Sequence, residues 1–157
     1  MLVNLSENLE LAAPPDDVWK VLRDTPRLAG LLPGVESVKA LDEAGVEAYA
    51  ATVHDKIGPF KVTLNLEIRV AEAVEPSLLK ASLKGLDSGG SNRVSGSMQV
   101  ALAPSAEGTG TGMRFEANVE VLGKLATLGA VPMRRRTAQL FAEFAGNIQK
   151  QFAKQER

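Results

Sequence analysis

Hydrophobic and polar residues alternate along most of the chain that precedes Gly123. The clearest case is the stretch from Phe60 to Glu75, in which Val62, Leu64 and Leu66 take alternate positions. A period of two residues places the apolar side chains on one face of a β-strand. The same pattern predicts further strands at 2–11, 35–41, 46–57, 78–84, 94–102 and 113–121. Because short turns join most of these segments, we expect a seven-stranded antiparallel sheet.

Two short helices are predicted after the first strand. Pro14 and Pro15 are followed by Asp16 and Asp17, and prolines and acidic residues both favour the first turn of a helix. This helix is expected to end near Asp24. A second helix is expected to start at Thr25-Pro26 and to end at Pro33-Gly34.

The last third of the chain has the period of an amphipathic helix, from about Met133 to Lys154. Its apolar positions are Leu140, Phe141, Phe144, Ile148 and Phe152. The preceding segment, Gly123 to Val131, is expected to be helical, with a kink or break near Pro132. A long apolar stripe needs a concave partner, and the sheet is the available one. The sequence therefore predicts an α+β fold in which a seven-stranded antiparallel sheet curves around the long helix, with function to be sought between the two.

Length and composition narrow the possible functions. At 157 residues the chain is expected to form one domain, 1–157. A net charge of −1 gives no reason to expect nucleic acid as a partner. The chain has no cysteine, which excludes disulfides, thiol nucleophiles and thiolate metal sites. The first residues do not resemble a signal peptide and no apolar stretch is long enough to span a bilayer, so we expect a cytoplasmic protein.

Several short motifs resemble those of a known family. The segments 18–24 (VWKVLRD) and 32–35 (LPGV) are similar to the opening of the CoxG-like family, named after the CoxG subunit of carbon monoxide dehydrogenase. Segment 56–61 (KIGPFK) resembles its strand–turn signature, and 84–87 (KGLD) and 123–129 (GKLATLG) agree with it too. The resemblance covers about residues 2–153. The element order also resembles the helix-grip arrangement of the wider START/Bet v 1-like (SRPBCC) superfamily.

The resemblance implies a hydrophobic cavity between the sheet and the long helix. We expect no covalently bound cofactor. The resemblance also implies an accessory role beside a molybdenum hydroxylase of the carbon monoxide dehydrogenase type. Within the family, the proposed roles are recruitment of that enzyme to the membrane and binding of a quinone that takes its electrons. We therefore expect a lipid or isoprenoid quinone as ligand, and peripheral contact with the inner face of the membrane.

The residues expected to line this cavity are apolar residues of the strands and of the long helix. They are Leu64, Leu66, Met98, Met113, Phe115, Phe141, Phe144 and Ile148. Such a lining suits a lipid or quinone better than a sugar or nucleotide. Periodicity alone does not distinguish a hollow interior from a filled one, so an ordinary packed core remains the alternative for all eight.

Candidate catalytic and metal-binding residues are few. His54, the one histidine, is followed by Asp55, and neighbouring strand residues point to opposite faces, so the two do not form a dyad. We expect His54 at the surface or at the rim of a pocket, and no metal site. The glycine-rich segment 108–112 lies between two predicted strands, so it is interpreted as a hairpin turn and not as a phosphate-binding loop.

A cluster of three arginines, Arg134, Arg135 and Arg136, lies near the start of the long helix. An exposed, solvated face is the simplest interpretation. The functional alternative is contact with an acidic partner or with lipid headgroups, for which three charges give weak attraction.

Three functions remain open from the sequence. The first is a noncatalytic protein that binds a hydrophobic ligand, in the manner that the family resemblance implies. The second is a cyclase- or hydrolase-like enzyme that uses the same cavity, which would need converging polar groups inside it. The third is a protein-docking module with a filled core.

Overall fold

The computed structural model describes residues 1–106 and 108–153. The strands and helices follow one another in the order that the sequence predicts. In order, the elements are β1 (Leu2–Leu11), α1 (Pro15–Arg23), α2 (Thr25–Ala29), β2 (Val35–Glu43), β3 (Val46–Ile57), β4 (Phe60–Val74), β5 (Leu78–Asp87), β6 (Asn92–Pro104), β7 (Thr111–Gly123), a 3-10 helix η1 (Lys124–Leu128) and α3 (Ala130–Ala153).

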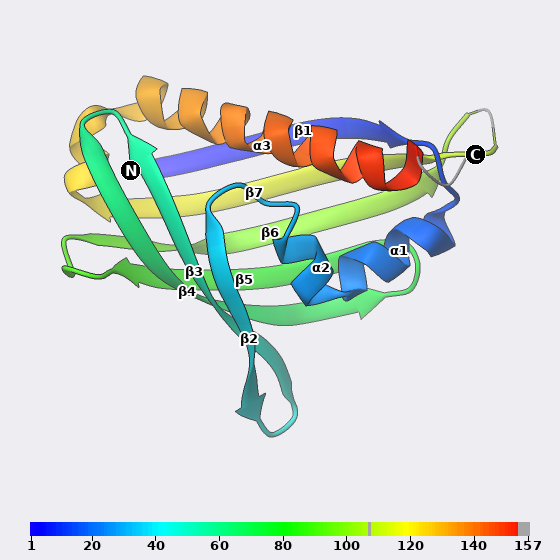
Figure 1. The fold of residues 1–157 in the computed structure, drawn as a ribbon, viewed down its shortest axis with the longest axis horizontal. Coiled ribbons are helices and arrows are strands. Elements are labelled where there is room, and N and C mark those ends of the chain that lie inside the picture. Colours follow the sequence, from blue (N-terminus) through cyan, green and yellow to red (C-terminus); the bar gives the residue numbers. More distant parts are fainter. Residues whose placement is uncertain (107, 154–157) are drawn as a thin grey trace.

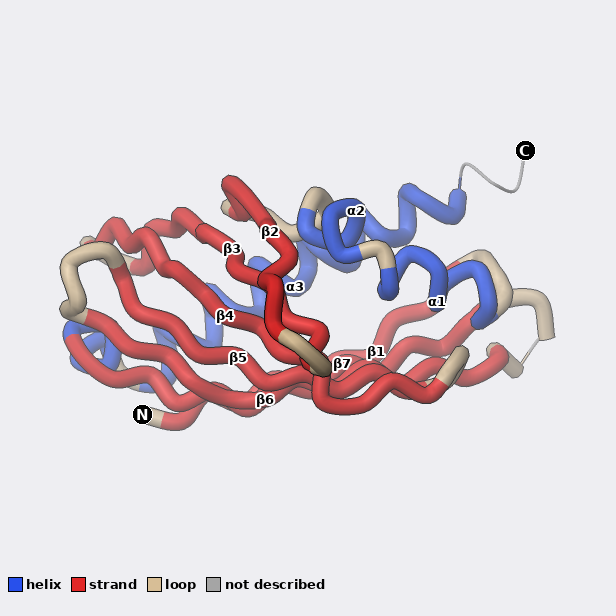
Figure 2. The backbone as a smooth tube through the Cα atoms, turned by 90° about the horizontal axis from the view of Figure 1, so that it is seen from below, coloured by secondary structure: helices blue, strands red, loops and turns tan. Residues whose placement is uncertain are grey.

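The seven strands form one antiparallel sheet in the order β1-β7-β6-β5-β4-β3-β2. Only β1 departs from sequence order, because it pairs with the last strand, β7. Figure 1 shows α3 lying along β1, and the β2–β3 hairpin projecting away from the rest of the sheet. Figure 2 shows α1 and α2 on the side toward which the sheet curves. The predicted α+β helix-grip fold, with a curved sheet around a long C-terminal helix, is confirmed.

The start of α3 differs from the prediction. The chain breaks at Gly129, which has φ 84°, and α3 begins at Ala130. Pro132 therefore lies inside the first turn of the helix. Proline is tolerated there because the first N–H groups of a helix have no intrahelical partner to lose. The left-handed conformation that glycine adopts without strain, and not the proline, separates η1 from α3.

The connection between β5 and β6 is shorter than the predicted strands 78–84 and 94–102 imply. Strand β5 continues through Gly85 to Asp87, and β6 already begins at Asn92. Asn92 closes the turn, since its side-chain amide donates to Asp87 Oδ2 at 2.8 Å and its Oδ1 accepts from the Leu125 N–H at 2.8 Å. These bonds hold the ends of β5 and β6 together at the turn, and they attach η1 to the first residue of β6.

The buried residues form two separate clusters, one at each end of the molecule. The first lies where α1, α2 and the last part of α3 meet the sheet, and includes Leu102, Met113 and Phe152. The second lies under η1 and the start of α3, and includes Val94, Val121 and Met133. The strands β6 and β7 run from one cluster to the other, so the middle of the sheet lies between two packed ends.

Candidate functional site

The middle of the concave face is mainly apolar, with Glu7 of β1 opposite Phe115, and it is only partly buried. On β6, Val94 and Leu102 belong to opposite buried clusters, and Met98 lies halfway between them on the same face of the strand. Met98, Phe115 of β7 and Leu64 of β4 are partly exposed and belong to neither cluster. Inward-facing apolar side chains that keep contact with solvent indicate a hollow. We call Leu64, Leu66, Met98, Phe115 and Phe141 the central strip.

Small residues help to create this hollow. Ala81 of β5, Met98 and Ala117 of β7 lie side by side across three strands, so two of the three positions carry only a methyl group. The next row includes Gly96, which has no side chain at all. Filling a core to normal density requires large side chains at such positions. The row of Met98 therefore carries little side-chain volume, whereas at Gly96 a Cβ would meet the backbone of β7, so this glycine allows the two strands to approach closely.

Three phenylalanines connect the sheet to the helix at one side of the hollow. The rings of Phe115 and Phe141 have centroids 5.5 Å apart, and those of Phe141 and Phe144 are 6.1 Å apart. These are ordinary distances for tilted aromatic pairs. The chain of rings passes from the partly exposed strip to the buried cluster, because Phe144 is 7% exposed. It forms an aromatic wall between the central strip and the first buried cluster.

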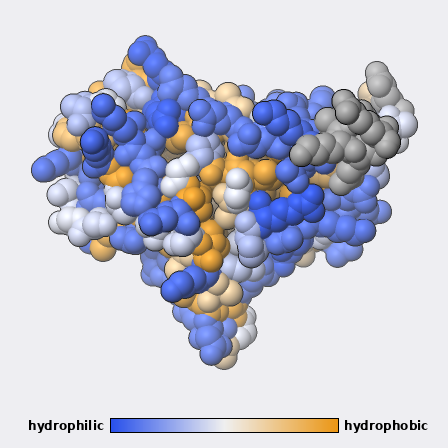
Figure 3. Space-filling model, viewed as in Figure 1, coloured by the Kyte–Doolittle hydropathy of each residue, from blue (hydrophilic) through white to orange (hydrophobic). Residues whose placement is uncertain are grey.

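The eight residues predicted to line the cavity fall into two groups. Leu64, Leu66, Met98, Phe115 and Phe141 are partly exposed members of the central strip. Met113, Phe144 and Ile148 are 1%, 7% and 0% exposed and pack in the first buried cluster. Figure 3 shows apolar surface gathered in the area that α3, α2 and β2 enclose. Contact of any of the eight with a ligand stays a prediction.

Polar side chains meet at one end of β3, on its inner face. Glu47 and Tyr49 are two residues apart on the strand, and share a face with Ala51. The Tyr49 hydroxyl donates to Glu47 Oε2 at 2.8 Å, and Arg23 Nη2 of α1 donates to Glu47 Oε1 at 2.6 Å. We call Arg23, Glu47 and Tyr49 the polar triad. The triad connects α1 to the sheet, and it places the ion pair of Arg23 and Glu47 on the strand face that carries Ala51.

The triad predicts a pH dependence of stability. Hydrogen bonding from Arg23 lowers the pKa of Glu47, so the folded protein holds the ionised form more strongly than the unfolded chain does. The stabilisation is complete above the ordinary Glu pKa of about 4.3 and is lost as the pH falls through the lower folded value. In urea unfolding, the stability difference between the wild type and Glu47→Gln should be largest at pH 7 and should shrink below about pH 5. A difference that stays constant from pH 7 to pH 3 would contradict this.

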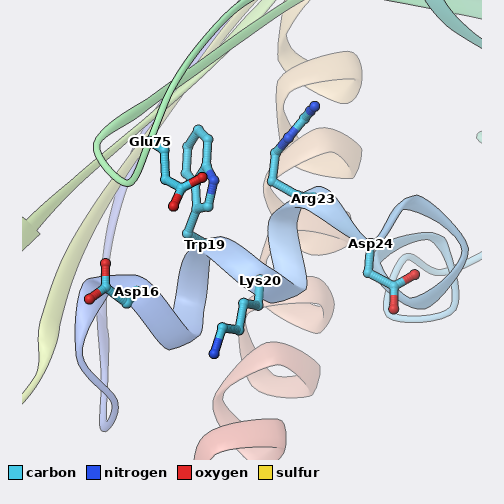
Figure 4. A pocket seen from close by; sticks show the side chains of 6 residues that line it. All are labelled: Asp16, Trp19, Lys20, Arg23, Asp24 and Glu75. Carbon is cyan, nitrogen blue, oxygen red and sulfur yellow. The ribbon is translucent and has the colours of Figure 1, made fainter.

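A depression of about 650 Å³ lies beside the triad, between α1 and the β4–β5 turn. Figure 4 shows Trp19 and Arg23 extending from the same side of α1, with Glu75 of the turn near the Trp19 ring. The full lining is Asp16, Trp19, Lys20, Arg23, Asp24 and Glu75. Three carboxylates and two cations thus surround the depression. Its rim is charged, and Arg23 connects it to the inner face of β3.

A second ion pair attaches α3 to β3. The Arg136 guanidinium donates to both carboxylate oxygens of Asp55, with Nη2–Oδ1 at 2.6 Å and Nε–Oδ2 at 3.1 Å. Asp55 faces inward, and His54 points to the opposite face of β3, so the two form no dyad, as predicted. Of the three arginines expected at a partner or at a membrane, Arg136 is therefore engaged within the chain. Arg134 and Arg135 are exposed, next to Val131, which is 63% exposed.

His54 lies on the outer face of the sheet, away from the hollow. Its Nδ1 is 2.9 Å from the Thr63 hydroxyl, and its Nε2 contacts Glu36. The side chains of His54 and Glu36 are exposed, and Thr63 is partly buried. Within residues 1–106 and 108–153, no three His, Asp or Glu side chains gather as ligands for a metal ion. No helix in the same part of the chain is long and apolar enough to cross a membrane.

The sequence interpretation missed the polar triad. Arg23 and Glu47 are 24 residues apart and lie on different elements, so no spacing rule joins them. One signal was available: in the strand 46–57, Glu47 and Tyr49 fall on the same alternate positions as Ala51 and Val53. A carboxylate beside apolar residues on the inner face of a strand needs a partner, and this need is a reason to look for a cation nearby.

Comparison with solved structures gives the same architecture. A conserved protein from Geobacillus kaustophilus is 25% identical, with a TM-score of 0.84 over 98% of this chain and 96% of that chain. A START superfamily protein from Mycobacterium smegmatis is 13% identical, with a TM-score of 0.69 over 96% and 97% of the two chains. The Zhui aromatase/cyclase from Streptomyces sp. R1128 is 16% identical, with a TM-score of 0.65 over 100% and 97%.

The last two likenesses show the fold alone, which is that of START/Bet v 1-like proteins. Because one of these neighbours is named as a cyclase, the fold is compatible with catalysis as well as with binding. No curated protein sequence matches the chain. A model of the family described as the CoxG subunit of carbon monoxide dehydrogenase matches residues 8–153, almost the whole chain. With its helix-grip fold and its resembling motifs, the chain belongs to the CoxG family.

Proposed function

We propose that the protein is a noncatalytic carrier of a hydrophobic small molecule, a lipid or an isoprenoid quinone. The observation that supports it most is the central strip, whose apolar side chains face inward and stay partly exposed. Exposed apolar surface inside a concave face costs free energy, at about 25 cal/mol per Å². A ligand that covers this surface recovers the cost, and this recovery is the driving force for binding.

The proposed partner is a molybdenum hydroxylase of the carbon monoxide dehydrogenase type, which the family membership suggests. The protein would recruit this enzyme to the cytoplasmic face of the membrane or accept its electrons on a bound quinone. Arg134, Arg135 and Val131 are the exposed residues proposed for contact with the enzyme or with lipid headgroups. Arg136 is left out of this surface because Asp55 already binds it.

A cyclase- or hydrolase-like reaction is the second candidate, since the polar triad places titratable groups on the inner face. A general base must accept a proton, and its pKa should lie near the working pH. Glu47 is unsuited to this role, because both of its oxygens accept hydrogen bonds and its pKa is lowered. Binding without catalysis is therefore the better supported proposal.

Placing a charge in the central strip should abolish ligand retention. Phe141→Asp puts a carboxylate where an apolar ligand would lie, and desolvating it costs several kcal/mol. Phe141 suits the experiment better than Phe144, because Phe144 is buried in the core and its substitution would unfold the protein. The measurement is mass spectrometry of an organic-solvent extract of natively purified protein, expressed as moles of ligand per mole of protein.

The matched control is Ala142→Asp, which adds the same charge to the next residue of α3, on its exposed side. We expect the wild type and Ala142→Asp to carry a lipid or quinone at near-stoichiometric amounts, and Phe141→Asp to carry none while retaining its circular dichroism spectrum. Equal ligand content in a folded Phe141→Asp variant would remove the central strip as the binding site. An empty wild type that also fails to take up added quinone or phospholipid would favour a docking module.

A further inference from the structure

We infer, given the ligand-binding function proposed above, that the polar triad of Arg23, Glu47 and Tyr49 holds the head of the ligand, and that this head is an uncharged group with a carbonyl oxygen. Glu47 and Tyr49 of the triad lie on the same face of β3 as Ala51 and Val53, and those two residues pair with Leu66 and Leu64 of the central strip. A ligand whose chain covers the strip can thus reach the triad with its polar end.

Arg23 has hydrogen-bonding capacity left for such a head. A guanidinium carries five N–H donors. Within residues 1–106 and 108–153, the single hydrogen bond of the Arg23 side chain goes to Glu47 Oε1. The remaining donors have no protein acceptor in this part of the chain. A carbonyl oxygen satisfies a donor without bringing a charge or a proton of its own.

The charges around the triad disfavour an anionic head. Glu47 neutralises Arg23, so the pair attracts a carboxylate only weakly, and a carboxylate beside Arg23 would also lie close to Glu47. The adjoining depression adds Asp16, Asp24 and Glu75 against Lys20. The surroundings of Arg23 therefore have an excess of negative charge. This excess selects against a free fatty acid and in favour of a ketone, an ester or a quinone-like head.

The test compares two ligands that differ only in the head. Palmitate and 2-heptadecanone have the same alkyl chain, and the methyl group of the ketone replaces the charged oxygen of the acid. Each is titrated against protein loaded with the uncharged fluorescent probe N-phenyl-1-naphthylamine, at pH 7.5. The wild type should bind the ketone at least about tenfold more tightly than the acid, since a neutral head avoids the repulsion.

Glu47→Gln keeps a hydrogen-bond acceptor beside Arg23 but removes the negative charge. The guanidinium then attracts carboxylates, so the preference should fall below about twofold or reverse in favour of palmitate. The matched control is Glu10→Gln, the same change at an exposed position of β1, which should leave the ratio of the two affinities as in the wild type. If Glu47→Gln does not fold, Arg23→Met serves instead: it should weaken ketone binding about tenfold and leave heptadecane binding unchanged.

Two results would overturn the inference while leaving the carrier function intact. One is a wild type that binds palmitate as tightly as the ketone or more tightly. The other is a Glu47→Gln variant that keeps the wild-type ratio of the two affinities or, in its place, an Arg23→Met variant that binds the ketone as tightly as the wild type does. By contrast, a wild type that binds neither ligand nor the probe would overturn the carrier function, and the role of the triad with it.

Discussion

Replacing Phe152 by alanine should lower the free energy of unfolding by about 3–5 kcal/mol. Phe152 is 0% exposed and is among the largest fully buried side chains of the protein. It packs in the first buried cluster with Leu9, Leu11 and residues of α1, so it fastens the end of α3 to both the sheet and the short helices. Removing the ring loses its burial and leaves a cavity, and the densely packed end cannot collapse to fill it.

Urea unfolding followed by circular dichroism measures this effect, with Lys150→Ala as the control on the exposed side of the same helix. The control should change the free energy of unfolding by less than about 0.5 kcal/mol. A loss below about 1 kcal/mol for Phe152→Ala would mean that the end of α3 is not packed as described, since even modest core truncations cost more than this. The central strip would then lack the fixed roof that a carrier needs.

The fold could be predicted from the sequence because its strongest features are local and periodic. The alternation in Phe60–Glu75 gives β4, which ends one residue earlier at Val74, and the stripe of Phe141, Phe144 and Ile148 gives α3. The buried members of that stripe follow the helical period, as the amphipathic pattern requires. Turn chemistry was harder to predict: both Gly129 and Pro132 interrupt a helix, and the sequence does not say which one does so here.

The sequence predicts which residues face the hollow, but it does not predict which of them are buried. Alternation gives the face of each residue, and so it places Met98 and Met113 on one surface. It does not say that Met113 is buried at one end while Met98 remains partly exposed in the middle. That difference depends on what lies opposite each residue. The helices converge on the ends of the sheet, and Ala81 and Ala117 flank the middle.

The charged contacts of the candidate site could not be predicted at all. Arg136 and Asp55 are 81 residues apart, and Arg136 was one of three adjacent arginines with nothing in the sequence to distinguish it. Side-chain direction on α3 makes the distinction: successive helical residues lie about 100° apart, so one of the three turns toward β3 while Arg134 and Arg135 stay exposed. A helix register set by apolar packing thus decides which arginine can pair.

Replacing Arg136 by methionine should lower the free energy of unfolding by about 1–3 kcal/mol, because it strips a largely buried carboxylate of its partner. The Asp55 side chain is 12% exposed and is held by the two-pronged contact with Arg136. Methionine keeps the apolar stem of the side chain, so the loss reports on the charge and the hydrogen bonds. Urea unfolding measures the total loss in the free energy of unfolding. Hydrogen exchange should quicken most in the first half of α3, where the pair of Arg136 and Asp55 joins the helix to β3.

The adjacent Arg135→Met is the matched control, with the same chemical change in the same helical turn and on an exposed side chain. It should alter stability by less than about 0.5 kcal/mol. Equal losses from the two variants would show that the Asp55 contact contributes nothing specific.

The ion pair of Arg136 and Asp55 also makes a prediction about function. Because α3 is the roof of the central strip, loosening its first half should speed release of N-phenyl-1-naphthylamine in Arg136→Met but not in Arg135→Met. Unchanged release in a destabilised Arg136→Met variant would mean that the ligand leaves by another side, and the depression at Arg23 and Trp19 would be the next place to test.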